Sequence, residues 1–117
     1  MSHTATVEVE IKDRTAFVKA CTRLGVEFSL NDTVTLYDGS EITGMTVRLK
    51  GWSYPVVFKD GKAHYDNYEG AWGEQSELDK FRQVYATEAA KRKARLQGFR
   101  VSERTLKDGT IRLVCQK

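Results

Sequence analysis

The sequence has few of the residues that usually indicate a disulfide scaffold, a metal centre or membrane insertion. Its 117 residues include two cysteines, two histidines and one proline, and no apolar run approaches the ~18 residues of a membrane-spanning helix. Residues 1–4 lack the basic and apolar regions of a signal peptide, so we expect a cytoplasmic protein with no membrane partner. Cys21 and Cys115 share no motif spacing, and we expect both to be reduced and partly buried.

The usual signatures of catalysis and cofactor binding are also missing. His3 and His64 have no Cys or His neighbour at metal-ligand spacing. Cys21 has no flanking nucleophile signature, and the sequence contains neither a dinucleotide-binding fingerprint nor a Walker-type loop. We therefore predict no catalytic residue, no metal and no cofactor, and a protein that is not an enzyme. An active site assembled from residues far apart in sequence is the weaker alternative.

The composition is that of one folded domain, residues 1–117. Hydrophobic residues make up 40% and charged residues 30% of the chain, which favours a packed core over disorder. The absence of a low-complexity tract indicates no linker. The net charge of +3 is too small by itself to indicate a nucleic-acid partner.

Hydrophobic periodicity predicts that the chain begins with a strand and a helix. Residues 4–11 alternate apolar and polar side chains, which is typical of a half-buried strand. Asp13 can cap the following helix, and Gly25 suits the left-handed position at its end. One apolar stripe of that helix is formed by Ala16, Phe17, Ala20, Cys21 and Leu24.

The remaining sequence predicts further strands and a second helix. We expect strands at 34–37 and 45–50, a hairpin at 54–65 turning at Asp60-Gly61, and a final hairpin at 99–115. The Lys-Asp-Gly triplets at 59–61 and 107–109 indicate the same turn chemistry. A long helix is predicted from Ser76, with Asp79 completing a capping pattern, to Gly98; Leu78, Phe81, Tyr85, Ala89 and Leu96 mark one side.

These elements predict an α+β fold. The expected order is β-α-β-β-β-β-α-β-β, with two helices packed on one face of an antiparallel or mixed sheet.

Aromatic residues interleaved with glycines mark one candidate surface. Five of them, Trp52, Tyr54, Tyr65, Tyr68 and Trp72, fall within a short stretch. Such residues can anchor a protein partner or stack on bases, or they can fill the sheet edge and the core. We expect Trp52, Tyr68 and Trp72 to bind a protein partner, and an exposed sheet edge to favour a homodimer.

Basic residues near the end of the second predicted helix form the alternative candidate, a nucleic-acid interface. Alternation places Arg100 and Arg104 with Ser102 on the polar face of the following strand. These residues can also have no binding role: cations are favoured at the C-terminal end of a solvent-exposed helix because they interact well with the helix dipole. The residues of this candidate interface are Lys91, Arg92, Lys93, Arg95, Arg100 and Arg104.

The tail of the sequence resembles a family of small conserved open-reading-frame proteins of cyanobacteria and plastids, a domain of unknown function. The resemblance is carried by Gln83, Tyr85 and Ala86, by Gln97, Gly98, Phe99 and Val101, and by Asp108, Gly109, Thr110, Ile111 and Leu113. The chain departs from the family pattern at Thr4, where an aromatic residue is usual, and at its end, where Arg-Trp is common, so it resembles a distant member.

The resemblance covers both ends of the chain, roughly half of it, and the tail is its specific part; at the start it is carried by Met-Ser-His at 1–3, by Ile-Lys-Asp-Arg at 11–14 and by Leu-Gly at 24–25. It implies no site residues, because the family has no established catalytic residues. It implies an accessory role, with an AAA-type ATPase as the partner that gene neighbourhood suggests.

Overall fold

The described residues of this computed structural model, 4–7, 10–66 and 71–117, form seven strands and two helices. Their order is β-α-β-β-β-β-α-β-β, which confirms the predicted order and the α+β class. In chain order they are β1 (Thr4–Val7), α1 (Arg14–Leu24), β2 (Glu27–Thr35), β3 (Glu41–Arg48), β4 (Val56–Lys59), β5 (Lys62–Asp66), α2 (Gln75–Leu96), β6 (Arg100–Thr105) and β7 (Ile111–Gln116).

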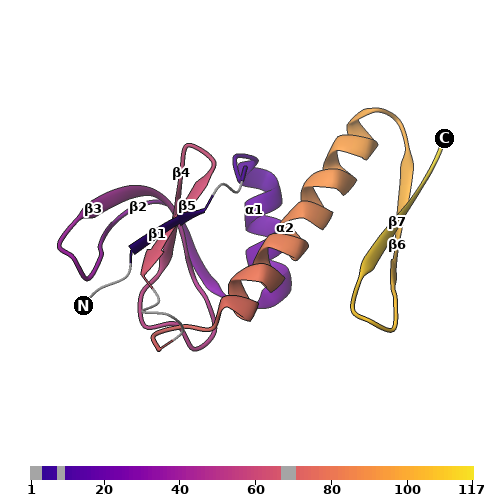
Figure 1. Ribbon diagram of the computed structural model, residues 1–117. Coiled ribbons are helices and arrows are strands. Elements are labelled where there is room, and N and C mark those ends of the chain that lie inside the picture. The colour runs from indigo at the N-terminus through magenta and orange to yellow at the C-terminus, as the bar shows by residue number, and fades with distance from the viewer. Residues whose placement is uncertain (1–3, 8–9, 67–70) are drawn as a thin grey trace.

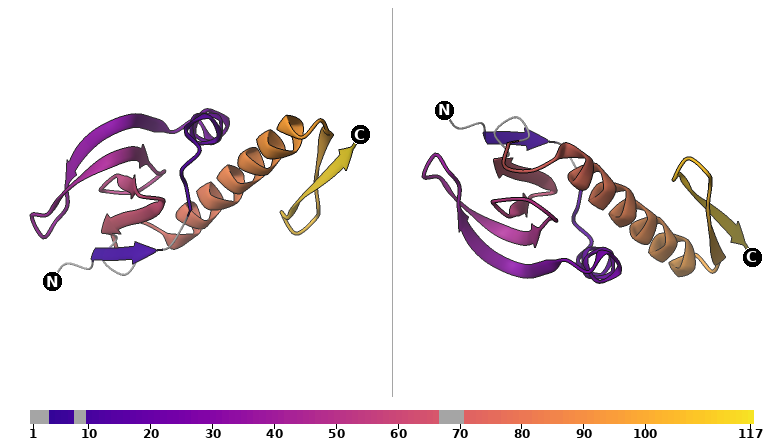
Figure 2. Two further views of the ribbon diagram at one scale, coloured as in Figure 1. Left: turned by 90° about the horizontal axis from the view of Figure 1, so that it is seen from above. Right: turned by 90° about the horizontal axis from the view of Figure 1, so that it is seen from below.

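The described strands form two separate antiparallel sheets. Five of them pair in the order β1-β5-β4-β3-β2, and β6 pairs only with β7. Both helices lie on one side of the larger sheet, and the β6–β7 hairpin lies beyond α2 (Figure 1). The molecule is therefore elongated, with extents of 52 × 30 × 23 Å, and the two views of Figure 2 place the hairpin at the end of α2 farthest from the sheet.

Helix α1 begins and ends as the sequence predicts. The Asp13 side chain accepts a hydrogen bond from the Ala16 amide at 3.1 Å, which satisfies one of the free donors of the first turn. Gly25 closes the helix with φ of 68°, a left-handed conformation that costs glycine little. The predicted apolar stripe is buried at Ala16, Phe17, Ala20 and Cys21.

The larger sheet is less predictable where it meets solvent. Strand β2 is nine residues long, whereas the sequence predicts only 34–37. It is an edge strand with a register shift between Ser29 and Asp32, and most of its side chains are exposed. A strand with neither face fully buried carries no clear alternation, so its pattern escapes detection.

The prediction that the two Lys-Asp-Gly triplets form the same turn is wrong. Asp60 and Gly61 both have positive φ, 53° and 80°, as a tight two-residue hairpin turn requires. In the other triplet only Gly109 has positive φ, and Asp108 Oδ1 accepts from the Thr110 amide at 2.9 Å. That turn matches the β2–β3 turn, where Asp38 Oδ1 accepts from the Ser40 amide at 2.9 Å.

Helix α2 differs from its prediction at its start. It begins at Gln75 after Glu74, with no side-chain cap, so the predicted capping by Ser76 is wrong. The indole of Trp52 instead donates to the Glu74 carbonyl at 3.0 Å and fixes the entry of the chain. The predicted end is confirmed, because Gly98 has φ of 88° and its amide donates to the Arg95 carbonyl.

The core lies between the larger sheet and the two helices. Phe17, Phe58 and Phe81 pack with ring centroids 5.6–5.8 Å apart. The part of this core that the structure describes extends along α2 only as far as Ala89. Leu96, predicted to lie on the apolar side of α2, is 74% exposed because the sheet does not reach that far.

Candidate nucleic-acid interface

The charge of the molecule is concentrated at its C-terminal end. Residues 90–117 contain nine of the 19 basic side chains and two of the 16 acidic ones, so the small net charge of +3 hides a strong segregation. Because this segment comprises the end of α2 and the β6–β7 hairpin, the excess positive charge lies at the end of the molecule opposite the larger sheet (Figure 1).

The hairpin has two faces of different character. Its register pairs Arg100 with Gln116, Ser102 with Val114 and Arg104 with Arg112, and these six residues form the face that we call the outer face. The inner face is formed by the alternate residues Val101, Glu103, Thr105, Ile111, Leu113 and Cys115. Five of the outer-face side chains are exposed, and Val114 is half-buried.

Four charged side chains hold the inner face against the helices. Arg23 of α1 donates to Glu88 at 3.0 Å and to Glu103 at 2.8 Å, and Lys91 of α2 donates to the same two carboxylates at 3.3 and 3.2 Å. We call these residues the ion cluster. Because Glu103 belongs to β6 and points into this cluster, the outer face points away from the helices.

The ion cluster also shifts the ionisation of its members. The hydrogen bond from Arg23, with that from Lys91, lowers the pKa of the Glu103 carboxyl below its ordinary value against the opposing effect of partial burial. The hydrogen bond to Glu103 raises the pKa of the Arg23 guanidinium in turn.

A second contact fixes the hairpin tip, where Gln83 Nε2 donates to the Gly109 carbonyl at 3.1 Å.

The six predicted basic residues divide into two groups. Lys91 belongs to the ion cluster, and Arg92 donates to Asp13 at 3.2 Å, so both link structural elements. The other four are exposed and form no ion pair with the described residues; they are Lys93, Arg95, Arg100 and Arg104.

Arg112 is the residue that the sequence-based prediction missed. It lies directly across from Arg104, and like charges in that position repel each other. The predicted turn at Asp108-Gly109 contains the necessary signal, because a hairpin closed there places the two arginines opposite each other. No carboxylate of the outer face offsets this repulsion, since the only acidic residue of the two strands is Glu103.

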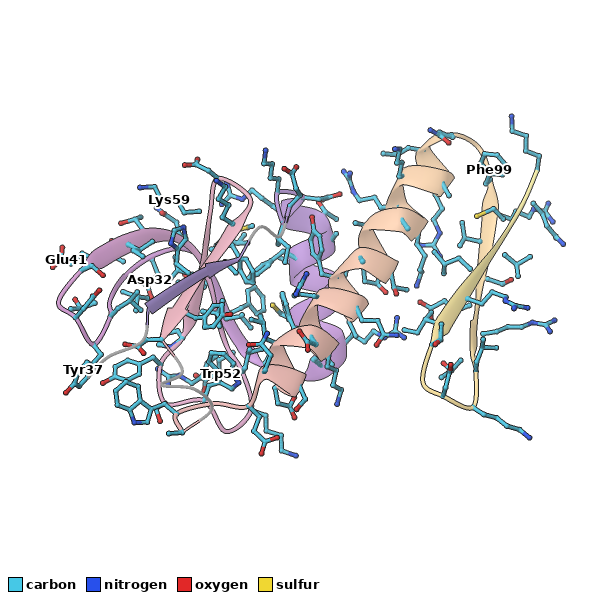
Figure 3. All side chains as sticks on the ribbon, viewed as in Figure 1. Asp32, Tyr37, Glu41, Trp52, Lys59 and Phe99 are labelled. Atoms are coloured by element: carbon cyan, nitrogen blue, oxygen red, sulfur yellow. The ribbon has the colours of Figure 1, made fainter. Side chains whose placement is uncertain are left out.

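The predicted aromatic surface is only partly exposed. Trp52 is 4% exposed and lies between the larger sheet and the start of α2, so its side chain is not available to a partner (Figure 3). Trp72 is half-buried beside Tyr37 and Tyr54, with ring centroids 4.9 and 5.6 Å away. Tyr37 is 54% exposed. Tyr68 lies outside the described residues.

The other titratable groups suggest little reactivity. Burial raises the pKa of the Cys21 thiol to about 12, which keeps it protonated at neutral pH. Burial and the nearby Lys59 and Lys62 lower the pKa of His64. Both cysteines are free, but Cys115 is exposed, contrary to the expectation that it is partly buried. Within the described part of the chain, no three His, Cys, Asp or Glu side chains converge as metal ligands would.

Comparison with known proteins does not assign this chain to a family. No family model, curated protein or solved structure matches this chain, and the resemblance to the cyanobacterial and plastid family stays a prediction. Among the residues that the structure describes, no helix is long and apolar enough to cross a membrane.

Proposed function

We propose that this protein binds nucleic acid through the outer face of the β6–β7 hairpin. The observation that carries the proposal is the opposition of Arg104 and Arg112 on a face that also presents Arg100 and holds no carboxylate. A nucleic acid bound against this face carries negative charge on its phosphates and acceptor atoms on its base edges, so it would replace repulsion between the two guanidiniums with attraction. Three cations on one face form a positively charged footprint of the kind expected of a nucleic-acid-binding surface.

The interface can be tested by removing its charge. We expect Arg100→Ala/Arg104→Ala/Arg112→Ala to bind a fluorescent oligonucleotide more weakly than wild type in anisotropy titrations. Because three positive charges are removed from the surface next to the nucleic acid, the slope of log affinity against log salt should also become shallower. The matched control, Arg14→Ala/Arg48→Ala/Lys80→Ala, removes the same charge from exposed positions in α1, β3 and the first half of α2.

The control distinguishes a local interface from general attraction. Equal weakening by both triple variants would mean that only the total charge matters, and the proposed interface would be rejected. Absence of binding by wild type to DNA and to RNA at low salt would reject the function itself. Circular dichroism of each variant establishes that the fold is retained.

A second candidate function is an accessory role through protein contacts, favoured by the exposed ring of Tyr37 beside Trp72. Aromatic side chains of this kind anchor protein interfaces. A partner protein, such as the AAA-type ATPase suggested by the family resemblance, should bind wild type and the hairpin triple variant but not Tyr37→Ala. Equal binding by Tyr37→Ala would reject this surface. A homodimer, if formed, should be visible by light scattering.

A further inference from the structure

We infer that the nucleic acid is double-stranded DNA and that the β6–β7 hairpin lies in its major groove with the outer face toward the base edges. This inference rests on the proposed function and specifies its substrate. It depends on two properties of the hairpin, its shape and the chemistry of the outer face.

The shape of the hairpin fits the major groove of B-form DNA. It is a two-stranded ribbon of six-residue strands, and strands in a pair lie about 4.8 Å apart. The major groove, about 12 Å wide, admits such a ribbon, whereas the major groove of A-form RNA is too narrow for side chains to read. The hairpin also lies at the end of α2 farthest from the larger sheet, so the outer face can approach a duplex before the bulk of the protein does (Figure 2).

The outer face carries the side chains that read base edges. Arginine donates two hydrogen bonds to guanine, glutamine pairs with adenine in the same manner, and an apolar side chain contacts the thymine methyl. Arg104 with Arg112, Ser102 with Val114, and Arg100 with Gln116 form three successive rows across the ribbon. Rows two residues apart are separated by about 6.7 Å, which is close to two base-pair steps of about 3.4 Å.

The same face lacks the side chains expected for single-stranded nucleic acid. Proteins that bind single strands stack the bases on aromatic rings, and none of the six outer-face residues is aromatic. The nearest ring in sequence is Phe99, which is half-buried and has the Lys117 ammonium 5.1 Å from its centroid. The observations therefore favour a duplex over a single strand.

The first experiment compares three probes of equal length at fixed salt: duplex DNA, one of its single strands, and duplex RNA. We expect duplex DNA to bind at least tenfold more tightly than either alternative, and the protein to protect guanine N7 in the major groove from dimethyl sulfate. Equal affinity for all three probes and for heparin would overturn the inference but leave phosphate binding intact. Preference for RNA or single strands would also overturn it, and binding to no probe would reject the proposed function as well.

The second experiment separates base reading from charge. Selection from a randomised duplex pool should enrich a short sequence, against which Arg104→Lys is then measured. Lysine keeps the positive charge but cannot donate in the two-pronged geometry of arginine. We expect a loss of roughly 5- to 150-fold on the enriched sequence, with the salt slope and the affinity for unrelated duplex unchanged. Failure to enrich any sequence, or an equal loss on all duplexes, would overturn major-groove reading.

Discussion

The molecule consists of two regions that are held in place by different forces. The body, residues 10–66 and 71–89, contains the described core, in which Phe17 and Phe81 are fully buried. The hairpin, residues 99–117, has no fully buried side chain: Val101, Ile111, Leu113 and Val114 are only half-covered. Apolar burial therefore stabilises the body, whereas the ion cluster and one contact at the tip position the hairpin.

The difference shows how one chain can combine a stable scaffold with an adjustable binding surface. Hydrophobic burial depends little on salt, but attraction between partly exposed charges is screened by it. The side chain of Glu88 is 9% exposed, whereas that of Arg23 is 35% exposed, so the cluster is partly open to solvent. We expect the hairpin to respond to ionic conditions under which the body does not change.

The largest expected effect comes from the body. Phe81→Ala removes a fully buried ring that packs against Phe17 and Phe58, and should lower the free energy of unfolding by about 3–5 kcal/mol. Urea denaturation measures this change. The matched hairpin variant, Leu113→Ala, truncates a half-covered side chain and should cost about 1 kcal/mol or less. Similar losses in both variants would mean that the hairpin shares the core and would remove the distinction.

The features that could be predicted from the sequence are those with local causes. The α1 cap at Asp13, the end at Gly25 and the tight turn at Asp60-Gly61 each depend on residues within a few positions of one another. The element order followed from these boundaries and from periodicity. On the candidate interface, Arg100 and Arg104 were placed on the outer face by alternation alone.

The features that could not be predicted depend on distant contacts. Trp52 is buried, and its indole donates to the carbonyl of Glu74, 22 positions away. Helix α2 starts directly after Glu74, without the side-chain cap that the sequence predicts at Ser76. Lys91 forms a bond to Glu103, and Arg92 to Asp13, so two residues that looked like free cations connect elements. A composition count treats a paired and an unpaired cation alike, and only the tertiary structure separates them.

A smaller effect is expected when the ion cluster loses the member that belongs to the hairpin. Glu103→Gln replaces the carboxylate of β6 that accepts from Arg23 and Lys91, and charge-assisted bonds of this kind contribute about 1.5–3 kcal/mol each. Partial exposure reduces that contribution, so we expect amide exchange in β6 and β7 to accelerate about tenfold, which corresponds to about 1.4 kcal/mol. Exchange in the first half of α2 should stay unchanged.

The control for this prediction is Glu41→Gln, which removes one exposed carboxylate from β3, far from the hairpin (Figure 3). It should leave exchange in both regions as in wild type. Uniform acceleration throughout the chain by Glu103→Gln would show that the cluster stabilises the body rather than docking the hairpin.

Acid should produce a still smaller change, again confined to the hairpin. The pKa of Glu103 is lowered in the folded protein from its ordinary value of 4.5, so its contribution to docking is complete above that value and is lost as pH falls through the lower native pKa. Amide exchange in β7, corrected for its intrinsic pH dependence, should therefore show weaker protection below about pH 4.5. Glu103→Gln should abolish this pH dependence; its persistence in that variant would assign the effect to another carboxylate.

The smallest effect on stability is expected at the two cysteines, of which the buried Cys21 reports the opening of the body. Cys115→Ser changes an exposed hairpin side chain and should alter the free energy of unfolding by no more than about 0.5 kcal/mol. A thiol reagent at neutral pH should label one site per native wild-type chain and none in Cys115→Ser, because the Cys21 thiol is buried and its pKa is raised to about 12. Urea should expose the second site with the same midpoint as unfolding of the body. Rapid labelling of Cys21 without denaturant would mean that the body opens readily under native conditions, and the contrast between a packed scaffold and a charge-held binding surface would no longer hold.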